Sequence, residues 1–249
     1  MPVIGMGTWR TFDTEEDREP LVKAAIGAGI DLFDSSPMYG RAEEALGKAL
    51  ARSLRSEVLV ASKIWTPEAA EGRRQAERAI GWFGGRVDIY QVHNLVAWRE
   101  QLAMLEAMKA EGKVGAVGAT DYREASFDDL ADVMRTGRLD MIQIPYTPIR
   151  REAESALLPL AAELGLGVLT MSPLQGGILE RQPSREQLAE LGVETWPQAV
   201  LKWIASDPRV SCVLTATSRP ERATEASLAG DQPFFDSAQR ELVVRIANP

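Results

Sequence analysis

The sequence contains a single cysteine, Cys212, and a single histidine, His93. One cysteine cannot form a disulfide within the chain, and the residues needed for CxxC or HExxH motifs are missing. We therefore expect no structural zinc site and no metal in the functional site. Because histidine is so scarce, the position of His93 becomes informative.

Two further absences concern location and partners. No stretch approaches the roughly 18 consecutive apolar residues that a membrane helix requires, and the opening MPVIGMGTW has no basic region or cleavage pattern. We therefore expect a cytoplasmic protein that binds no membrane. The net charge of -8 disfavours nucleic-acid binding, which depends on clustered Lys and Arg. With 45% hydrophobic and 26% charged residues the chain is globular in composition, and we expect a small-molecule partner.

The glycine-rich turns of nucleotide-binding sheets are absent as well. Three G-x-G sequences begin at Gly5, Gly27 and Gly165, but each lacks the third glycine of the G-x-G-x-x-G fingerprint. The sequence also contains no P-loop and no G-x-S-x-G elbow. These absences weaken the doubly wound sheet, which is the alternative fold for a chain of alternating strands and helices.

The sequence does contain a regular series of short apolar runs separated by amphipathic stretches. Several runs are unbroken, as expected for strands that are covered on both faces. The clearest amphipathic stretch has an apolar stripe at helical spacing (Ala42, Ala45, Leu46, Ala49, Leu50), with Glu43, Glu44 and Lys48 on the other side. The predicted strands are Val3–Met6, Asp31–Asp34, Val58–Ser62, Val87–His93, Val114–Gly118, Asp140–Ile144, Gly167–Met171 and Val210–Leu214.

The spacing of these runs decides between an open sheet and a barrel. Eight units in 249 residues take about 31 residues each, close to the roughly 30 residues of one strand-and-helix unit. The total also matches the roughly 250 residues that are typical of a (β/α)8 barrel. We therefore predict an α/β protein whose residues 1–249 form a single domain, a (β/α)8 TIM barrel.

A barrel of this kind builds its active site at the C-terminal ends of its strands. Asp34 ends the second predicted strand, Tyr39 follows in the loop 35–40, Lys63 follows the third strand and His93 ends the fourth. An adjacent ammonium lowers the pKa of a tyrosine hydroxyl, and a carboxylate holds that ammonium in place. His93 can donate a hydrogen bond to an oxygen that gains negative charge. Singly, such residues are often helix caps or packing residues, but together on successive strand ends they indicate an acid–base site.

The segments around these residues resemble the successive signatures of the aldo-keto reductase superfamily. They are Gly5-Met6-Gly7-Thr8-Trp9, Asp34-Ser35-Ser36-Pro37-Met38-Tyr39-Gly40, Ser62-Lys63 and Gln91-Val92-His93-Asn94. The order and spacing match, and the resemblance spans nearly the whole chain. It implies a (β/α)8 barrel with Asp34, Tyr39, Lys63 and His93 as the catalytic residues of NAD(P)H-dependent carbonyl reduction. Tyr39 would protonate the carbonyl oxygen, Lys63 and Asp34 would tune Tyr39, and His93 would orient the carbonyl.

The resemblance also implies a cofactor site. Residues 120, 121 and 143 match the family's nicotinamide-amide ligands, and the segment 171–177 resembles the loop that cradles the pyrophosphate. The segment 214–225 resembles the one that grips the adenosine 2'-phosphate, with Arg222 as its arginine and Arg219 assisting. We therefore expect NADPH to be preferred, with NADH bound more weakly. The expected cofactor-binding residues are Thr8, Trp9, Thr120, Asp121, Gln143, Met171, Ser172, Leu174, Gly176, Thr217, Ser218, Arg222 and Glu225.

Several positions depart from the family's pattern. Asp121 stands where the family has Asn, and a carboxylate can accept a hydrogen bond from the nicotinamide amide but cannot donate one. Met171 and Ala216 stand where the family often has Tyr and Lys. We also expect the barrel to lack the family's N-terminal hairpin and long C-terminal loop. The substrate pocket should then be shallow and walled by Trp9, Met38, Trp65, Asn94 and Trp98.

The expected function is reduction of small aldehydes or ketones to alcohols with NADPH. The alternative is a regulatory or sensor barrel that binds the cofactor with little turnover. The changes at Asp121 and Ala216 and the missing hairpin favour this alternative, whereas the complete set of four catalytic residues disfavours it. The expected partner is a small carbonyl substrate, and the chain is expected to be a monomer or a small homo-oligomer.

Overall fold

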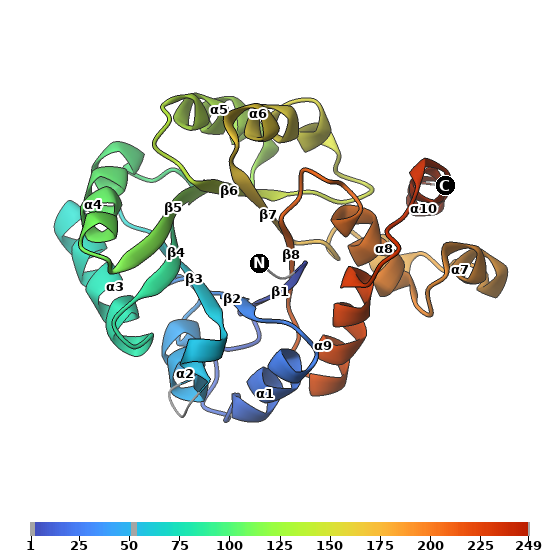
Figure 1. The fold of residues 1–249 in the computed structure, drawn as a ribbon, viewed down its shortest axis with the longest axis horizontal. Coiled ribbons are helices and arrows are strands. Elements are labelled where there is room, and N and C mark those ends of the chain that lie inside the picture. The colour runs from blue at the N-terminus through green and yellow to red at the C-terminus, as the bar shows by residue number, and fades with distance from the viewer. Residues whose placement is uncertain (1–2, 51–53, 249) are drawn as a thin grey trace.

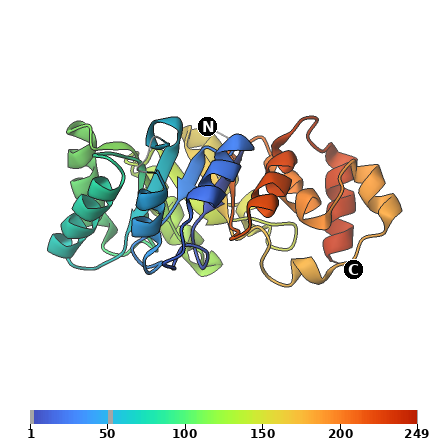
Figure 2. The ribbon, with the colours of Figure 1, turned by 90° about the horizontal axis from the view of Figure 1, so that it is seen from below.

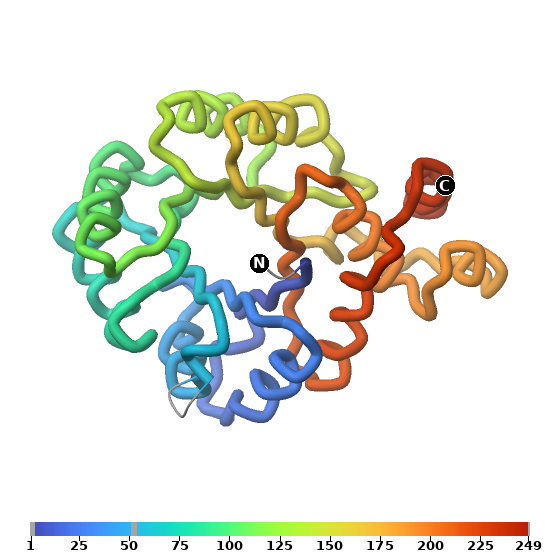
Figure 3. The backbone as a smooth tube through the Cα atoms, in the orientation of Figure 1, coloured from blue at the N-terminus to red at the C-terminus, as the bar shows by residue number. Residues whose placement is uncertain are grey.

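The computed structural model describes residues 3–50 and 54–248, and its strands form a closed parallel barrel. Each strand pairs with the next one along the chain, and β8 pairs with β1, so the predicted (β/α)8 barrel is confirmed. In Figure 1 the strands form an inner ring that the helices surround. The backbone trace in Figure 3 shows the units following one another around this ring in chain order.

The strands lie close to their predicted positions. β4 and β7 have the predicted bounds, whereas β5 continues to Thr120, which pairs with His93 of β4. β3 extends past its predicted end because Lys63 continues the ladder opposite Gln91 of β4. We had expected Lys63 to follow the third strand, but it lies within β3. The strands are β1 (Ile4–Gly7), β2 (Leu32–Asp34), β3 (Leu59–Ile64), β4 (Val87–His93), β5 (Val114–Thr120), β6 (Met141–Pro145), β7 (Gly167–Met171) and β8 (Cys212–Thr215).

The helices that cover the barrel are short, and several carry clear start signals. α7, α8 and α10 each begin with a capping box, in which the residue just before the helix and a Gln three positions later satisfy each other's backbone N–H groups. Within the two described segments of the chain, no helix is long and apolar enough to cross a membrane. The α-helices are α1 (Glu19–Gly27), α2 (Ala42–Leu50), α3 (Ala69–Trp82), α4 (Trp98–Ala110), α5 (Phe127–Arg135), α6 (Leu157–Leu164), α7 (Arg185–Leu191), α8 (Trp196–Ala205), α9 (Pro220–Ser227) and α10 (Ser237–Ala247). Short 3-10 turns are η1 (Arg55–Glu57), η2 (Glu124–Ser126), η3 (Glu152–Glu154), η4 (Ile178–Glu180) and η5 (Leu228–Gly230).

Helices α7 and α10 lie outside the ring of helices that packs directly on the strands (Figures 1 and 2). α10 is fixed to α8 by a hydrogen bond from the indole Nε1 of Trp203 to the carbonyl oxygen of Arg240, at 3.1 Å. Leu242 and Val243 of α10 are buried. The apolar C-terminal segment therefore packs on the outer wall of the barrel.

Helix α2 forms as predicted, but it buries one of its charged residues. Glu43 precedes Leu46 by three positions and Leu50 by seven, so the three side chains share one helix face. Glu43 keeps only 3% of its surface exposed, whereas Glu44 accepts a hydrogen bond from Lys48 at the surface. Our assignment of Glu43 to the solvent side is therefore wrong.

The side chains inside the barrel change character along its axis. Near the strand starts a buried apolar cluster includes Leu32, Ala61, Ile89, Met141 and Leu169. Since successive side chains of a strand alternate in direction, residues two positions later point the same way, and these are Asp34, Lys63, Gln91, Gln143 and Met171. At Gly118 a Cβ atom would come within 2.9 Å of Cγ of Met141 and 3.1 Å of Cγ of Gln91, so the glycine makes room for both side chains. An apolar plug at one end thus supports a polar layer at the other.

Candidate active site

Asp34 and Lys63 form a buried ion pair at the C-terminal end of the barrel. The Lys63 ammonium donates to both carboxylate oxygens of Asp34, at 2.7 and 2.6 Å, and to the carbonyl oxygen of Ser35 at 2.9 Å. Burial raises the pKa of Asp34 against the pull of the ammonium. Burial is the largest single influence on the pKa of Lys63 and lowers it, but the charge and hydrogen bonds of Asp34 and the contribution of Tyr39 together raise it above its ordinary value, so Lys63 stays protonated. The pair supplies a fixed cation held by three acceptors.

Tyr39 lies beside this cation. The Lys63 ammonium nitrogen is 5.2 Å from the centre of the Tyr39 ring. Burial raises the pKa of Tyr39, and the charge of Lys63 offsets only part of that increase. Our expectation that the ammonium brings this pKa below its ordinary value is therefore wrong for the structure, because the mouth of the barrel withdraws the phenol from water. Tyr39 keeps its proton at neutral pH and can donate it.

His93 completes the group from the end of β4. Its ring meets the Tyr39 ring edge to face, with the ring centres 6.0 Å apart. Its Nδ1 lies 3.0 Å from the hydroxyl oxygen of Ser36. Burial lowers the pKa of His93 to about 3, and the Lys63 charge acts in the same direction. His93 is therefore a neutral imidazole that can donate one hydrogen bond. The structure brings Asp34, Tyr39, Lys63 and His93 together as predicted.

A pair of glutamines connects this group to β6. Gln91 donates to the side-chain oxygen of Gln143 at 2.9 Å, and the amide nitrogens of both glutamines approach the Asp34 carboxylate, at 3.5 and 3.4 Å. The hydroxyl of Thr120, at the end of β5, is buried and has no partner among the described residues. An unpartnered buried hydroxyl beside an amide suits a ligand that carries both donors and acceptors.

Asp121 lies next to Thr120, but its side chain is already hydrogen-bonded within the protein. Its carboxylate accepts hydrogen bonds from the backbone N–H of Arg123 at 2.9 Å and from the Arg123 guanidinium at 3.0 and 2.6 Å. The side chain is fully buried, while half of the Arg123 side chain is exposed. Asp121 therefore closes a local turn before η2, with its charge paired to Arg123, and it caps neither η2 nor α5. It is not the free negative charge facing a ligand that the sequence had suggested.

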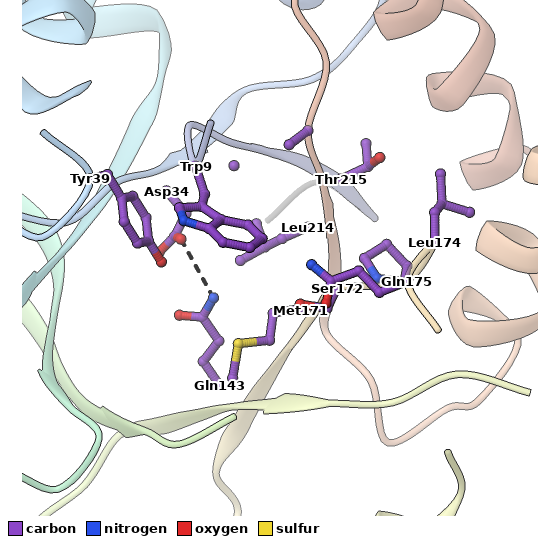
Figure 4. A pocket seen from close by; sticks show the side chains of 13 residues that line it. Trp9, Asp34, Tyr39, Gln143, Met171, Ser172, Leu174, Gln175, Leu214 and Thr215 are labelled. Atoms are coloured by element: carbon purple, nitrogen blue, oxygen red, sulfur yellow. Dashed lines mark hydrogen bonds between the residues drawn. The ribbon is translucent and has the colours of Figure 1, made fainter. Parts of the chain in front are cut away.

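A hollow of about 190 Å³ opens directly above Asp34, Tyr39 and Gln143 (Figure 4). We name it the inner hollow. Trp9 lies across one side, and Met171 and Ser172 from β7 and its loop form another. The remaining lining residues are Gly7, Pro173, Leu174, Gln175, Leu214, Thr215 and Ala216. The predicted ligand residues Trp9, Gln143, Met171, Ser172 and Leu174 thus share one surface.

A second hollow of about 260 Å³ continues outward between α8 and α9, and we name it the outer hollow. It shares Leu174, Thr215 and Ala216 with the inner hollow, so the two form one groove. Its far end is lined by Thr217, Arg219, Arg222 and Glu225. Arg222 donates to the Glu225 carboxylate at 2.5 Å, and Thr195 donates to the same carboxylate at 2.8 Å. Ser218 is exposed beside this end but is not part of the lining.

The loop after β7 has an uncommon backbone. Ser172, Gly176 and Gly177 have positive φ values of 57°, 75° and 77°. Such left-handed residues turn the chain so that successive N–H groups point into a concavity, a geometry that suits anions. At Gly176 a Cβ atom would also approach Ile149 to 3.1 Å. The loop is therefore shaped by its glycines, and Gly176 contributes through its backbone conformation.

Thr8 takes a different place from the one predicted. It is fully buried, and its hydroxyl forms hydrogen bonds with the carbonyl oxygen of Asp34 at 3.1 Å and with the hydroxyl of Ser35 at 2.9 Å. It does not line either hollow of the groove. Thr8 ties the end of β1 to the loop after β2 and so supports Asp34 from behind.

The side of the mouth opposite the groove is apolar. Met38, Trp65 and Val96 line a hollow of about 510 Å³ together with Pro37, Thr66, Pro67 and Gln75. Trp9, Met38 and Trp65 are each more than 40% exposed. Asn94 directly follows His93, and its side-chain oxygen is buried without a partner among the described residues. Trp98 begins α4 beneath the guanidinium of Arg99 and does not line this hollow.

Sequence reasoning missed two polar residues of the site. Gln91 belongs to the quoted motif but received no role, although its position two residues before His93 puts both on the inner face of β4. Ser36 lies 57 positions from its partner His93, and no local pattern signals that contact. Alternation along a strand could have identified the first residue, but only the closed barrel reveals the second.

The fold resembles solved structures of reductases. The crystal structure of an aldo/keto reductase from Klebsiella pneumoniae in complex with NADP and acetate superposes with a TM-score of 0.85 and is 24% identical, covering 100% of this chain and 92% of that chain. A second Klebsiella pneumoniae aldo-keto reductase, in complex with NADPH, gives a TM-score of 0.84 at 23% identity, with the same coverage. At these identities the likeness shows the fold alone.

Sequence relatives extend the comparison. The NADH-specific methylglyoxal reductase of Escherichia coli is 28% identical over an alignment of 224 residues that covers 74% of this chain and 67% of the relative. An aldo-keto reductase of a Mycobacterium species is 30% identical over an alignment of 215 residues that covers 82% of this chain and 75% of the relative. The model of the aldo/keto reductase family matches residues 3–242. The chain therefore belongs to the aldo/keto reductase family, and it is an oxidoreductase.

Proposed function

We propose that this enzyme reduces small aldehydes or ketones to alcohols, that it prefers NADPH over NADH, and that Tyr39 is the proton donor. One observation carries the proposal. A protonated Tyr39 lies beside the Asp34–Lys63 ion pair and a neutral His93, at the floor of a groove that leads away over β7 and β8. This arrangement provides an acid, a cation that stabilises its conjugate base and a neutral hydrogen-bond donor in one place.

The roles of the residues follow from their charge states. When bound, the reduced nicotinamide supplies a hydride to the carbonyl carbon. Tyr39 gives its hydroxyl proton to the carbonyl oxygen, and the resulting phenolate is stabilised by the Lys63 ammonium until water returns the proton. Asp34 keeps that ammonium in place. His93, neutral because burial holds its pKa at about 3, donates a hydrogen bond to the carbonyl oxygen and so orients it.

The residues of the groove fit an extended dinucleotide. The free hydroxyl of Thr120 and the amide of Gln143 offer a donor and acceptors for a nicotinamide carboxamide at the inner end. Met171 would cover an apolar face of the ring, since a thioether packs against such faces without strict direction. The loop containing Ser172, Leu174 and Gly176 would hold the pyrophosphate through its N–H groups. The Klebsiella pneumoniae structures in complex with NADP and with NADPH support this assignment.

The preference for NADPH rests on the far end of the groove. Arg222 there presents a guanidinium that can bind a 2'-phosphate through two hydrogen bonds, with Thr217 and Ser218 beside it. Glu225 holds Arg222 in position and also offsets part of its charge. Ala216 adds no second cation. We therefore propose a modest preference, which also agrees with a relative in Escherichia coli named for NADH.

The proposed substrates are small carbonyl compounds. Trp9, Met38 and Trp65 present exposed apolar surface around the mouth, and the unpartnered side-chain oxygen of Asn94 adds one hydrogen-bond acceptor near His93. These walls select by apolar contact more than by shape, so several aldehydes and ketones should be reduced. We also propose that the enzyme works in the cytoplasm as a monomer or small homo-oligomer and binds neither nucleic acid nor membrane, as its composition led us to expect.

The test compares wild type with Tyr39→Phe, using NADPH oxidation against a panel of small aldehydes and ketones. The Phe variant lacks the transferable proton, so kcat should fall about 10²- to 10⁴-fold while the Kd for NADPH stays nearly unchanged. A Phe variant that kept more than about a tenth of the wild-type kcat would contradict the assignment of the acid. A wild type that binds NADPH but turns over no faster than Tyr39→Phe would instead indicate the regulatory or sensor barrel.

A further inference from the structure

Ser36 lies between Asp34 and Tyr39 in sequence and touches His93 in space. Its side chain is fully buried, and its hydroxyl oxygen is 3.0 Å from Nδ1 of His93. The same oxygen accepts a hydrogen bond from the backbone N–H of Met38 at 3.3 Å. The loop 34–39 therefore carries the carboxylate that holds Lys63, the proposed acid Tyr39 and a hydroxyl fixed against the imidazole.

A count of protons determines the direction of the Ser36–His93 hydrogen bond. A serine hydroxyl has one proton to donate and two lone pairs to accept with. The Met38 N–H uses one lone pair, and His93 is the other described side chain bonded to this hydroxyl. If Nδ1 carried a proton, the serine proton would have no acceptor in a fully buried place, which costs free energy. Donation from Ser36 to an unprotonated Nδ1 satisfies every group.

This direction has a consequence for the other ring nitrogen. A neutral imidazole has one N–H, so an unprotonated Nδ1 leaves the proton on Nε2. Nε2 has no hydrogen-bond partner among the described residues and is not among their buried unpartnered atoms, and the ring keeps 7% of its surface exposed. Nε2 is therefore the nitrogen that can reach a ligand at the mouth.

We propose that Ser36 is a positioning residue that fixes the tautomer of His93, so that Nε2–H points to the carbonyl oxygen of the substrate. The inference rests on the proposed function, because the hydrogen bond matters only when a carbonyl is reduced. Without Ser36 the imidazole would have to leave Nδ1 unpartnered or carry its proton there, and a ring protonated on Nδ1 presents only an acceptor lone pair to an oxygen that gains negative charge.

The chain offers an unusually clear test, because His93 is its only histidine. Protein labelled with ¹⁵N in the histidine ring gives a single imidazole signal set, and the two-bond ¹H–¹⁵N correlation pattern reports which nitrogen is protonated. We expect the Nε2–H tautomer in wild type and in Ser36→Thr, which keeps the hydroxyl. Ser36→Ala should show a changed Nδ1 shift and a population protonated on Nδ1. Ser35→Ala is the matched control, since Ser35 is equally buried in the same loop but bonds to Thr8, and it should leave the His93 pattern unchanged.

Kinetics provide the second readout. Ser36→Ala should lower kcat/KM for carbonyl reduction about 2- to 10-fold, the fold-change expected for one net hydrogen bond, while Ser36→Thr restores most of it and the Kd for NADPH does not change. A wild-type ring protonated on Nδ1, or a Ser36→Ala variant with unchanged tautomer and unchanged kcat/KM, would overturn the inference and leave the proposed function standing. A wild type that reduces no carbonyl would overturn the proposed function, whatever tautomer it shows.

Discussion

Replacing Glu43 with Gln should change how the stability of the protein depends on pH. Glu43 is 3% exposed, accepts a hydrogen bond from the hydroxyl of Ser62, and lies near the charges of Lys63 and Arg78. Burial raises its pKa to about 7, because the hydrogen bond and the two cations offset only part of the lost hydration. In the unfolded chain the same carboxyl titrates near 4.5.

The sign of the effect follows from proton binding. Between pH 4.5 and 7 the folded protein holds a proton on Glu43 that the unfolded chain has released, so stability falls as pH rises through this window and then levels off. A difference of about 2.5 pKa units corresponds to about 3 kcal/mol over the whole window, of which about 2.5 kcal/mol falls between pH 5 and pH 8. Glu43→Gln carries a neutral amide at every pH, so its stability should not fall in this window through titration at position 43.

The assay is urea denaturation of wild type and Glu43→Gln at pH 5 and pH 8. The two proteins should have similar free energies of unfolding at pH 5, and the variant should be the more stable by about 2 to 3 kcal/mol at pH 8. Glu44→Gln on the same helix is the control, because Glu44 is paired at the surface with Lys48 and should show no such gain at pH 8. If the free energy of unfolding changed by the same amount between pH 5 and pH 8 in wild type and in Glu43→Gln, the raised pKa of Glu43 would be refuted.

Two further predictions concern the cofactor groove. The wild type should prefer NADPH over NADH about ten- to a hundredfold, and Arg222→Ala should remove most of this preference because one charge-assisted contact to the 2'-phosphate is lost. Titration of wild type and variant with both cofactors measures the preference. Equal Kd values for NADPH and NADH in wild type would contradict the prediction. Asp121→Asn should leave the ratio of the Kd values for NADPH and NADP⁺ unchanged, because Arg123 already neutralises this carboxylate. A ratio that shifts towards tighter NADPH would instead mean that the charge acts on the nicotinamide.

Much of the fold and of the site is written in short stretches of sequence. Strands β4 and β7 have their predicted bounds because unbroken apolar runs and flanking breakers act locally. The four proposed catalytic residues were identifiable because parallel strands in a barrel end at one rim, so side chains at successive strand ends must meet. The matching motifs also named residues that the structure places along one groove, with Arg222 at its far end.

Other features depended on depth and on distant neighbours. The pKa of Tyr39 moves opposite to the expected direction because burial outweighs the charge of Lys63, and burial is a property of the closed barrel. The sequence placed Glu43 on the solvent side with Glu44, but the packing of α2 on the strands buries it.

The sequence by itself determined the order of strands and helices, the barrel and the types of residue at its mouth, because these depend on periodicity and spacing along the chain. Only the tertiary structure decided which polar atoms pair there. Gln91 with Gln143, and Ser36 with His93, are more than 50 positions apart, and barrel closure alone brings them within hydrogen-bond distance. Asp121 and Arg123 are close in sequence, yet their pairing depends on the turn after β5. Charge state and hydrogen-bond direction are thus set by contacts that the chain makes only when folded.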